Sequence, residues 1–581
     1  MNRDGRRLRL LKGFLTLLWV GLVVRLAWVQ IFRGGYLERE AESQHLSRRE
    51  LLPQRGRLFD RFGRGIALNR LCCSIWIMPR YVRDKDGLAD IFAVFGLGKR
   101  EAIRRSLEEN KNPFWFRRKV DYGIADFLRK VLVMWHAARN CTLAVLVEDD
   151  NLRVYPYKEV CANITGFVGC ERGLAGLECE FDSLLRGRPG WIMLQRDGTG
   201  GSYPYPSYPM KPPLPGADLH LTLDLDIQQI AFQVLASAVT RTQALKGAAI
   251  VLDAQTGAVR ALVDYPTYDP ERFQDFDASR YKSSAVSDQF EPGSSFKLVI
   301  CAAALESPGM PELTTRSYDV SAGYFEVQGR KLHDVHKNGV LSFDSLFINS
   351  SNAGCALLST KIEPEHFYTI AQGLGFTNPV GIGLPNEGAG WIDPPKRLTP
   401  LRLANNAFGQ GLTVTLVQMA AAYLCVANDG IFLRPYLIES VRSRGRVVAQ
   451  FGPVEVRRVL KPETARRIKE ILSRVVTNGT GTRAAIPGVS VAGKTGTAQK
   501  VEPNGQYSMT RSRMTFIGFF PVETPRYLIA VLLDEPKTDR FAGTAACPVF
   551  REIGIRLLEL ERLRRNPEYA ELEPTAEVSS R

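Results

Sequence analysis

The stretch Glu291-Pro292-Gly293-Ser294-Ser295-Phe296-Lys297 is the segment from which the fold and chemistry of this chain can best be inferred. If a helix begins near Pro292, the i, i+3 spacing puts the Ser294 hydroxyl and the Lys297 amine on one face, one turn apart. A serine hydroxyl is a weak nucleophile until a base takes its proton, and a lysine with a lowered pKa can be that base. Ser-x-x-Lys also occurs in exposed helices with no catalytic role, so its meaning depends on further motifs.

The second motif is Ser350-Ser351-Asn352, which follows a predicted helix over residues 342–348. A hydroxyl from Ser350 and an amide from Asn352 could relay a proton and hold the carbonyl of a substrate amide. The alternative is a helix end capped by small polar residues, which needs no catalytic role.

The third motif is Lys494-Thr495-Gly496-Thr497, in a segment that we predict to be a strand. Because Gly496 has no side chain, a substrate backbone could lie against that strand edge. Lys494 would lower the pKa of Lys297 and attract a substrate carboxylate, which the hydroxyls of Thr495 and Thr497 would help to hold. An ordinary glycine-containing turn is the alternative.

Taken together and in this order, the three motifs resemble those of β-lactamases and penicillin-binding proteins. Nearly the whole chain resembles a class B penicillin-binding protein, a monofunctional peptidoglycan D,D-transpeptidase. The further matching segments are Arg55-Gly56 with Asp60-Arg61, Arg153-Val154-Tyr155-Pro156, residues 173–182, Leu221-Thr222-Leu223-Asp224, Phe408-Gly409-Gln410-Gly411 and Ala427-Asn428-Asp429-Gly430. Ser350-Ser351-Asn352 followed by Ala353-Gly354 resembles the division-specific branch more than the elongation branch. Phe62 and Leu416 depart from the family pattern, in which Asn and Pro are common.

The resemblance implies an α+β fold whose transpeptidase domain has an antiparallel sheet flanked by helices. It implies that Lys297 takes the proton of Ser294, which attacks the carbonyl between the last two D-alanines of a stem peptide. Backbone N–H groups of Ser294 and Thr497 would form the oxyanion hole. Ser350 would pass a proton to the leaving amine, and Asn352 would hold the peptide amide. The implied catalytic residues are Ser294, Lys297, Ser350, Asn352 and Lys494, and the substrate-binding residues are Thr495, Gly496 and Thr497. β-Lactams would acylate Ser294, and no metal or cofactor is needed.

Residues 13–32 form an apolar segment of about 20 residues, which is long enough to cross a bilayer as a helix. The basic residues before it predict a cytoplasmic N-terminus, and the lack of a small-residue cleavage site argues against a signal peptide. We therefore expect a single-pass protein of the bacterial inner membrane with its catalytic domain outside the cytoplasm.

Local residue patterns predict several elements. Charged helical stretches are expected around residues 99–111 and 125–139, a strand over 221–223 and an amphipathic helix over 226–240. A β-hairpin is expected over 248–263, and paired strands over 514–520 and 526–533.

The expected organisation has six parts. They are a cytoplasmic basic tail (1–12), a transmembrane helix (13–32), an elongated pedestal of the dimerisation type (46–200), a Pro-rich linker (201–215), a transpeptidase domain (216–560) and a disordered tail (561–581). The expected partners, which follow from the resemblance, are peptidoglycan stem peptides, β-lactams, the membrane, a polytopic glycosyltransferase of the SEDS type and other division proteins.

Composition excludes some other classes of function. The 581 residues carry a formal net charge of +15 with no nucleic-acid-binding motif, so the charge favours anionic lipid or an anionic polymer as a neighbour. None of the ten cysteines forms Cys-x-x-Cys, and most are expected to be buried free thiols. His333-Asp334-Val335-His336 has two potential zinc ligands but no evident third, so a loop before the Ser350 helix is the preferred interpretation.

Alternatives to a septal transpeptidase remain. An elongation-specific transpeptidase or a D,D-carboxypeptidase would use the same residues, the latter with water as acceptor. A β-lactamase or penicillin sensor would share the motifs, but rarely the pedestal. A non-catalytic scaffold of the division complex would have no use for the intact motifs.

Overall fold

The computed structural model describes residues 3–33, 35–37, 46–139, 144–169, 172–196, 202–204 and 209–566. The chain divides into two compact units. The first unit comprises Met1–Gln54, Arg70–Leu152 and Gly187–Pro215, and the second comprises Arg55–Asn69, Arg153–Arg186 and Gly216–Arg581. The units therefore follow different boundaries from the predicted domains, since two segments of the predicted pedestal fold with the second unit.

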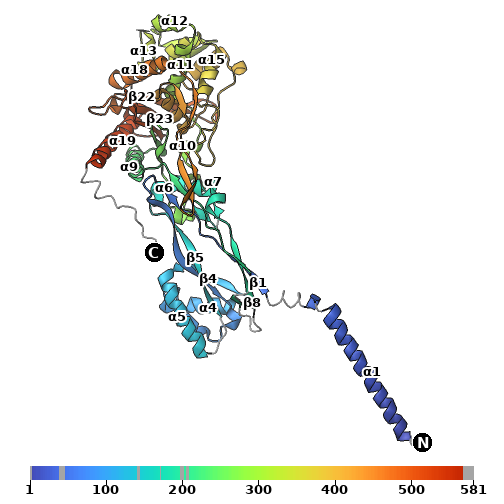
Figure 1. Cartoon of the computed structure of the whole chain (residues 1–581). Helices are drawn as coiled ribbons and strands as arrows, with labels where there is room; N and C mark the ends of the chain where they lie inside the picture. The colour runs from blue at the N-terminus through green and yellow to red at the C-terminus, as the bar shows by residue number, and fades with distance from the viewer. Residues whose placement is uncertain are drawn as a thin grey trace. The chain divides into compact units, whose positions relative to one another are not determined.

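Helix α1 (Arg3–Phe32) is the apolar helix of the first unit (Figure 1). Residues Gly5–Phe32 are long and apolar enough to cross a membrane, and none of that window is buried inside the protein. The helix begins at Arg3, so the basic cluster predicted as a tail is already helical. It is the only helix of this kind in the described part of the chain, which agrees with a single-pass membrane protein.

The segment predicted as a Pro-rich linker is partly strand. Strands β9 (Ser202–Pro204) and β10 (Met210–Lys211) both pair antiparallel with β8 (Gly190–Arg196), and β1 (Leu46–Leu51) also pairs with β8. The linker prediction is wrong for these residues, because their backbone groups are bound in a sheet and Pro204 stands at a strand end, where a missing N–H is tolerated. Residues 205–208 lie outside the described residues.

The remainder of the first unit has its own core. Helices α3 (Lys85–Val94), α4 (Arg100–Glu109) and α5 (Tyr122–Arg139) pack with strands β3 (Gly65–Ile77), β4 (Phe114–Asp121) and β5 (Val145–Val154). The charged helices predicted at 99–111 and 125–139 are thus confirmed. Leu88, Phe92 and Leu128 are fully buried in this core.

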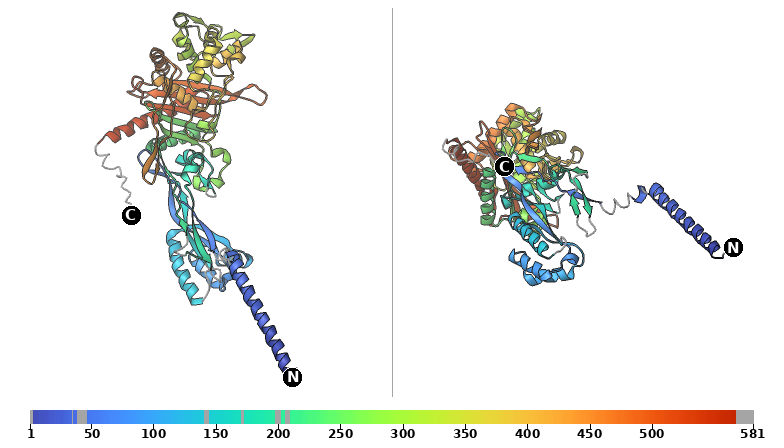
Figure 2. Two further views of the ribbon diagram at one scale, coloured as in Figure 1. Left: turned by 45° about the vertical axis from the view of Figure 1, so that its right-hand side comes forward. Right: turned by 60° about the horizontal axis from the view of Figure 1, so that its bottom comes forward.

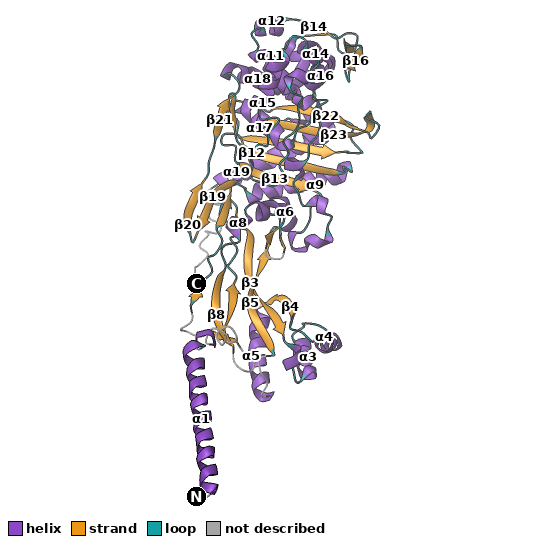
Figure 3. Cartoon of the chain, turned by 90° about the vertical axis from the view of Figure 1, so that its right-hand side faces the viewer, coloured by secondary structure: helices purple, strands orange, loops and turns teal. Residues whose placement is uncertain are grey.

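The second unit is built around a five-stranded antiparallel sheet in the order β13-β12-β24-β23-β22. Its strands are β12 (Lys246–Asp253), β13 (Val259–Tyr265), β22 (Ala492–Val501), β23 (Tyr507–Phe520) and β24 (Tyr527–Asp534). Figures 2 and 3 show helices on both sides of this sheet. The predicted hairpin over 248–263, the pair 514–520 with 526–533, and the α+β class are confirmed.

Each face of the sheet packs in a separate core. Helices α9 (Leu225–Thr242) and α19 (Ala542–Arg565) share a core with Ile529 and Val531, whereas α11 (Lys297–Glu306) and α17 (Leu416–Ala427) share one with Ala530. Every residue of β24 is buried, which explains its unbroken apolar run.

Two predicted boundaries need correction. Strand β11 (Asp218–Leu221) ends before Leu223, because Asp224 already caps α9 by accepting the backbone N–H of Asp226. Residues 561–565, predicted as disordered tail, are the last turn of α19, where Arg564 donates to both carboxylate oxygens of Asp224 at 2.7 and 2.9 Å. Residues 567–581 lie outside the described residues.

The other elements of the second unit surround the sheet. The helices are α6 (Lys158–Thr165), α7 (Gly176–Glu180), α8 (Asp182–Leu185), α10 (Ser284–Ser287), α12 (Met310–Thr315), α13 (Phe343–Ile348), α14 (Asn352–Ser359), α15 (Pro364–Gly373), α16 (Pro400–Ala407) and α18 (Pro462–Asn478). The short strands are β2 (Leu58–Phe59), β6 (Val168–Gly169), β7 (Arg172–Gly173), β14 (Tyr318–Asp319), β15 (Tyr324–Val327), β16 (Arg330–His333), β17 (Val340–Leu341), β18 (Ile431–Leu433), β19 (Ile438–Ser443), β20 (Arg446–Gln450) and β21 (Glu455–Arg458).

The eight cysteines in the described part of the chain are all free thiols, and seven of them are buried. This agrees with the prediction that most cysteines are buried free thiols. The other two, Cys141 and Cys170, lie outside the described residues.

Candidate active site

Ser294 lies on a one-turn 3₁₀ helix, Gly293–Phe296, which leads directly into α11. The predicted helix start near Pro292 is therefore confirmed, although its first turn is tighter than an α-helix. Two hydrogen bonds stabilise the turn. The Ser295 hydroxyl donates to Pro292 O at 2.8 Å, and the Tyr423 hydroxyl donates to Ser295 O at 2.8 Å. Ser294 itself lines a pocket, and within the described chain its hydroxyl makes no hydrogen bond.

Gly293 shows why this turn needs glycine. Its φ is +55°, and a Cβ at this position would come within 2.6 Å of the Thr497 carbonyl oxygen. A side chain would thus be strained in conformation and would also push the Ser294 turn away from β22. Close backbone contact between the turn and the strand fixes the position of the serine.

Lys297 is buried one turn after Ser294, with 1% of its surface exposed. Its ammonium donates to Ser350 O at 2.6 Å and to Asn352 Oδ1 at 2.8 Å, and lies 3.2 Å from Ser350 Oγ. The structure therefore brings the first two predicted motifs together around one amine.

The two neighbouring serines of the second motif have different tasks. Ser351 caps α14 by accepting the backbone N–H of Gly354 at 2.9 Å, which is the capping role considered as the alternative. Ser350 instead has a left-handed backbone, with φ of +59°, and its hydroxyl accepts hydrogen bonds from buried amines. The capping interpretation thus holds for Ser351, whereas Ser350 lies at the position that the catalytic interpretation needs.

Lys494 approaches Ser350 from β22. Its ammonium donates to Ser350 Oγ at 2.9 Å and lies 3.3 Å from Thr495 O. With 1% of its surface exposed, Lys494 sits behind Ser350 rather than in the open groove. The Thr495 hydroxyl shares a hydrogen bond of 2.7 Å with the hydroxyl of Thr480.

Burial of two amines side by side determines their ionisation. Desolvation lowers the pKa of Lys297, and desolvation together with the charge of Lys297 lowers the pKa of Lys494 to about 7. The sequence predicts that the Lys494 charge lowers the pKa of Lys297, whereas burial is the main cause at both positions. A lysine pair that loses one proton near neutral pH can supply a base.

Glycine is needed at position 496 for a different reason from the one predicted. A Cβ there would come within 2.4 Å of Thr515 Oγ1, 2.7 Å of Pro292 O and 2.8 Å of Ser295 Oγ. The glycine therefore lets β22 pack tightly against the Ser294 turn. β22 is nevertheless an edge strand of the five-stranded sheet, so an extended substrate could pair with it.

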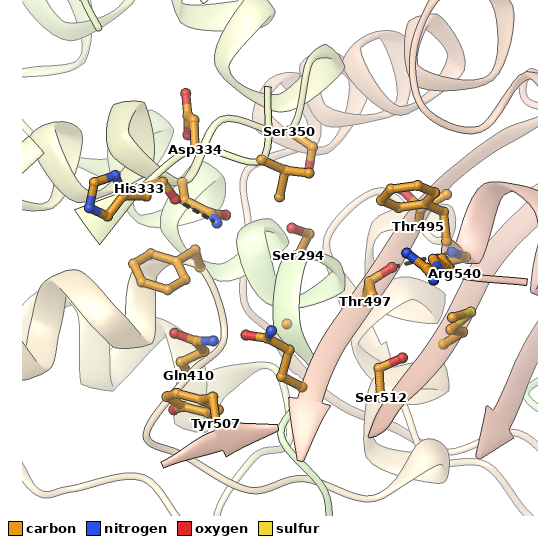
Figure 4. Close-up of a pocket in the computed structure, with 18 of the residues that line it drawn as sticks. Ser294, His333, Asp334, Ser350, Gln410, Thr495, Thr497, Tyr507, Ser512 and Arg540 are labelled. Carbon is orange, nitrogen blue, oxygen red and sulfur yellow. Dashed lines mark hydrogen bonds between the residues drawn. The ribbon is translucent and has the colours of Figure 1, made fainter. Parts of the chain in front are cut away.

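The pocket has a volume of about 1430 Å³, and its walls come from separate parts of the second unit. Figure 4 shows Ser294 and Ser350 facing Thr495 and Thr497 across it, with Asp334 near His333 on the side away from the two threonines. Of the predicted residues, Ser294, Ser350, Asn352, Thr495 and Thr497 line the pocket. Lys297 and Lys494 contact it through Ser350.

Asp334 is a site residue whose role the sequence analysis missed. Its carboxylate accepts the Ser351 hydroxyl and the backbone N–H of Ala353, both at 2.8 Å, and so ties β16 to the start of α14. His333 is the last residue of β16 rather than part of a loop, and its ring lies 5.5 Å from that of Tyr324. The ring of His336 lies 6.3 Å from that of Phe541. Asp334, in the segment that suggested a metal site, thus positions Asn352 by binding the residues on either side of it.

Glu291 is a second missed residue at the edge of the site. Its Oε1 accepts the Gly411 N–H at 2.9 Å and the Tyr507 hydroxyl at 3.2 Å, which links the Ser294 turn to two wall segments. Burial raises the pKa of this carboxyl group. Its place directly before Pro292-Gly293 was visible in the sequence, but its partners are more than 100 residues away.

Comparisons with known proteins agree with this geometry. Residues 247–554 match the model of the penicillin binding protein transpeptidase domain, and residues 50–221 match that of the penicillin-binding protein dimerisation domain. The chain is 30% identical over 562 residues to stage V sporulation protein D of Bacillus subtilis, covering 93% of this chain and 84% of the relative.

Two further likenesses cover most of the chain. It is 31% identical over 546 residues to the probable peptidoglycan D,D-transpeptidase PenA of Neisseria meningitidis, covering 93% of this chain and 90% of that one. The crystal structure of penicillin binding protein 3 from Mycobacterium tuberculosis complexed with aztreonam superposes with a TM-score of 0.68 at 27% identity, covering 88% of this chain and 97% of that chain.

Proposed function

Because the chain belongs to the family of penicillin-binding protein transpeptidases, we propose that it cross-links peptidoglycan stem peptides through an acyl-enzyme on Ser294. It is a class B penicillin-binding protein and a peptidoglycan D,D-transpeptidase of the serine type. The observation that carries the mechanism is the placement of Ser350 between the amines of Lys297 and Lys494, with Ser294 one turn before Lys297.

Acylation begins when neutral Lys297 takes the proton of the Ser294 hydroxyl. The alkoxide oxygen forms a bond to the carbonyl carbon between the last two D-alanines, and the N–H groups of Ser294 and Thr497 stabilise the oxyanion. Burial supports this role, because it lowers the pKa of Lys297 and so favours the neutral amine.

The tetrahedral intermediate then loses D-alanine. Ser350 donates its hydroxyl proton to the leaving amine and is reprotonated by Lys297 or Lys494, both of which contact its oxygen. The C–N bond breaks and the Ser294 ester remains. An amine from a neighbouring stem peptide attacks this ester and gives a proton to the lysine pair. The bond between the acyl carbon and the Ser294 oxygen then breaks, the cross-link is formed, and the lysine pair returns the proton to Ser294.

The donor peptide binds as an added strand along β22, whose outer edge is unpaired in the sheet order. Asn352 holds the peptide amide with its side chain, whose oxygen already accepts from Lys297 at 2.8 Å. A β-lactam presents a similar strained amide in the same place, so it acylates Ser294 and blocks the enzyme. The aztreonam complex of the mycobacterial neighbour supports this for a related protein.

The proposed cellular role rests on the second motif, on the basic N-terminal residues and on helix α1. Ser350-Ser351-Asn352 followed by Ala353-Gly354 favours septal synthesis over elongation. The basic residues before Gly13 favour a cytoplasmic N-terminus, which puts the transpeptidase unit outside the cytoplasm. A polytopic glycosyltransferase of the SEDS type and other division proteins are the partners that we propose, with membrane-spanning α1 as one contact. Midcell enrichment of the tagged protein supports septation, whereas a lateral-wall pattern favours elongation.

Product analysis tests transpeptidation against hydrolysis. Full-length protein in liposomes is given a lipid-linked precursor and a glycosyltransferase, and the muropeptides are separated by mass spectrometry. We expect cross-linked dimers, which disappear with Ser294→Ala or with a β-lactam. Trimmed monomers alone would show that water is the acceptor and that the D,D-carboxypeptidase alternative is correct.

A further inference from the structure

A cation on the wall of the groove next to Ser294 would stabilise an anionic substrate, and Lys494 is poorly placed to provide it. Its ammonium is directed to Ser350 Oγ at 2.9 Å and to Thr495 O at 3.3 Å, and 1% of the residue is exposed. A carboxylate in the open groove would therefore meet Ser350 before it met Lys494. Another group must recognise the charge of the donor.

Arg540 is an exposed residue that lines this groove. It lies in the segment between β24 and α19, and Ala542, the first residue of α19, donates its backbone N–H to Thr497 Oγ1 at 3.2 Å. Because consecutive Cα atoms are 3.8 Å apart, the Arg540 Cα lies within about 8 Å of that of Ala542. Figure 4 shows Arg540 beside Thr497 on the β22 side of the pocket.

The guanidinium of Arg540 has no carboxylate partner within the described part of the chain. The other cationic residues lining the pocket either contact other side chains or lie on other wall segments. Arg511 pairs with Glu502, and Lys331 lies 4.4 Å from the centre of the Tyr324 ring. The backbone N–H of Lys537 donates to Thr242 O at the end of α9, and Arg330 belongs to the β15–β16 wall.

We propose that Arg540 binds a carboxylate of the donor stem peptide and so determines the preference of this enzyme for anionic donors. The inference rests on the proposed function, because it uses the same groove and the same acyl-enzyme. An arginine presents a planar fork of N–H donors that matches a carboxylate in a bidentate geometry. Thr497, whose hydroxyl oxygen accepts from Ala542, lies on the same side and can donate its own proton to the second face of the anion.

Two carboxylates of a stem peptide can reach this position. One is the C-terminal carboxylate of D-Ala-D-Ala, which leaves with the departing D-alanine. The other is a carboxylate upstream of the scissile bond, which stays in the acyl-enzyme. The recognition chemistry is the same, but probes that carry the charge on opposite sides of the reacting carbonyl distinguish the two.

The test measures the second-order rate constant of acylation for the full-length protein and the variants Arg540→Gln and Arg540→Lys. The charge-position probes are benzylpenicillin, whose carboxylate is on the ring, and carbenicillin, which adds a side-chain carboxylate. The neutral comparator is the methyl ester of N-benzoyl-D-alanyl thioglycolate, matched with its free acid. Lys537→Gln is the control variant, since it removes an exposed cation lining the same pocket.

If Arg540 binds the C-terminal carboxylate, loss of the charged hydrogen bond predicts that Arg540→Gln lowers acylation by both penicillins and by the anionic thioester about tenfold or more. If Arg540 binds the upstream carboxylate, only acylation by carbenicillin falls to this extent. In either case acylation by the neutral ester changes less than about twofold. Arg540→Lys should recover part of the loss, and Lys537→Gln should match wild type. A loss with both penicillins indicates the C-terminal carboxylate, and a loss with carbenicillin alone indicates the upstream one. Equal losses for neutral and anionic thioesters, or no loss with any anionic probe, would overturn the inference. If wild-type protein is not acylated by any probe, the proposed function itself fails.

Discussion

Lys494 donates a hydrogen bond to the Ser350 hydroxyl at 2.9 Å, and the amine of Lys297 lies 3.2 Å from the same oxygen. One hydroxyl thus connects two buried amines that come from α11 and β22. Repulsion between the amines and their desolvation both favour loss of a proton. This arrangement lets Ser350 move protons between the lysine pair and a leaving group.

Replacement of Ser350 by Ala should reduce acylation of Ser294 by about 10²-fold or more, because the proton route to the leaving group is broken. The fold should persist, since Ser350 caps no helix. Stopped-flow measurement with a chromogenic β-lactam gives the rate, and thermal unfolding gives the stability. Wild-type acylation by Ser350→Ala would contradict the relay.

Ser351→Ala is the matched control for that variant. It removes the N-cap of α14 and the hydrogen bond to Asp334 at 2.8 Å, so it should mainly lower stability, by about 1 kcal/mol. Its acylation rate at a temperature well below unfolding should stay closer to wild type than that of Ser350→Ala. If Ser351→Ala were acylated more slowly than Ser350→Ala, the relay would belong to Ser351 and the account would be contradicted.

The pH dependence of acylation should report the lysine pair. Because the pKa of Lys494 is lowered to about 7, we expect the rate to rise with pH and to level off above about pH 7. The measurement is the acylation rate from pH 5 to pH 9 at constant ionic strength. A rise that continues to the ordinary lysine range, near 10.5, would contradict the proposed ionisation.

Stability should vary with pH for the same reason. The pKa of Lys494 is near 7 when folded and near 10.5 when unfolded, so between these values the unfolded chain binds more protons. Stability from this group therefore rises as pH rises from about 7 to 10.5, and its burial is most costly below pH 7. The Tm of Lys494→Met minus that of wild type should accordingly be larger at pH 6 than at pH 9. A difference that is constant with pH would mean that Lys494 is not desolvated as described.

Gly496→Ala should damage the site by displacing the Ser294 turn. The new Cβ would come within 2.7 Å of Pro292 O and 2.8 Å of Ser295 Oγ, so β22 or the turn must move. We expect a lower Tm and a drop in acylation of about 10²-fold, since small displacements of reacting groups are costly. Gly452→Ala is the control, because a Cβ there meets nothing within 4 Å. Equal behaviour of the two variants would contradict the close packing.

Asp334→Asn tests whether β16 positions Asn352. The carboxylate accepts from Ser351 and Ala353, and an amide oxygen can replace only part of this. Acylation should fall about tenfold, because Asp334 positions Asn352 through the start of α14. The pH at which the rate levels off should move down, since burial lowers the pKa of Lys297 and the Asp334 charge opposes this by raising it. Wild-type acylation by Asp334→Asn would contradict the positioning role.

Local patterns in the sequence were sufficient to predict much of this structure. The membrane helix, the hairpin over β12 and β13, and the pair β23 and β24 follow from apolar runs and turn residues. Ser294, Lys297, Ser350, Asn352 and the β22 motif were found because their spacing is local within each motif. The order of the motifs then identified the family, which the matches over 50–221 and 247–554 show.

Contacts between distant segments could not be predicted in this way. Position 496 needs glycine because Pro292 O, 204 residues earlier in the chain, lies too close for a side chain. Asp334 matters because it accepts a hydrogen bond from Ser351, the N-cap of α14. The prolines around β9 and β10 predict a linker. The structure differs because pairing with β8 overrides the local signal of Pro204. The last turn of α19 was read as a tail, although Arg564 is held by Asp224 from the other end of the second unit.

Mapping of the covalent adduct tests the central claim most directly. Full-length protein is treated with benzylpenicillin at neutral pH, digested, and analysed by tandem mass spectrometry. The account predicts one penicilloyl adduct, on Ser294, absent from Ser294→Ala and formed slowly by Ser350→Ala. An adduct on another residue, or undiminished labelling of Ser294→Ala, would contradict it.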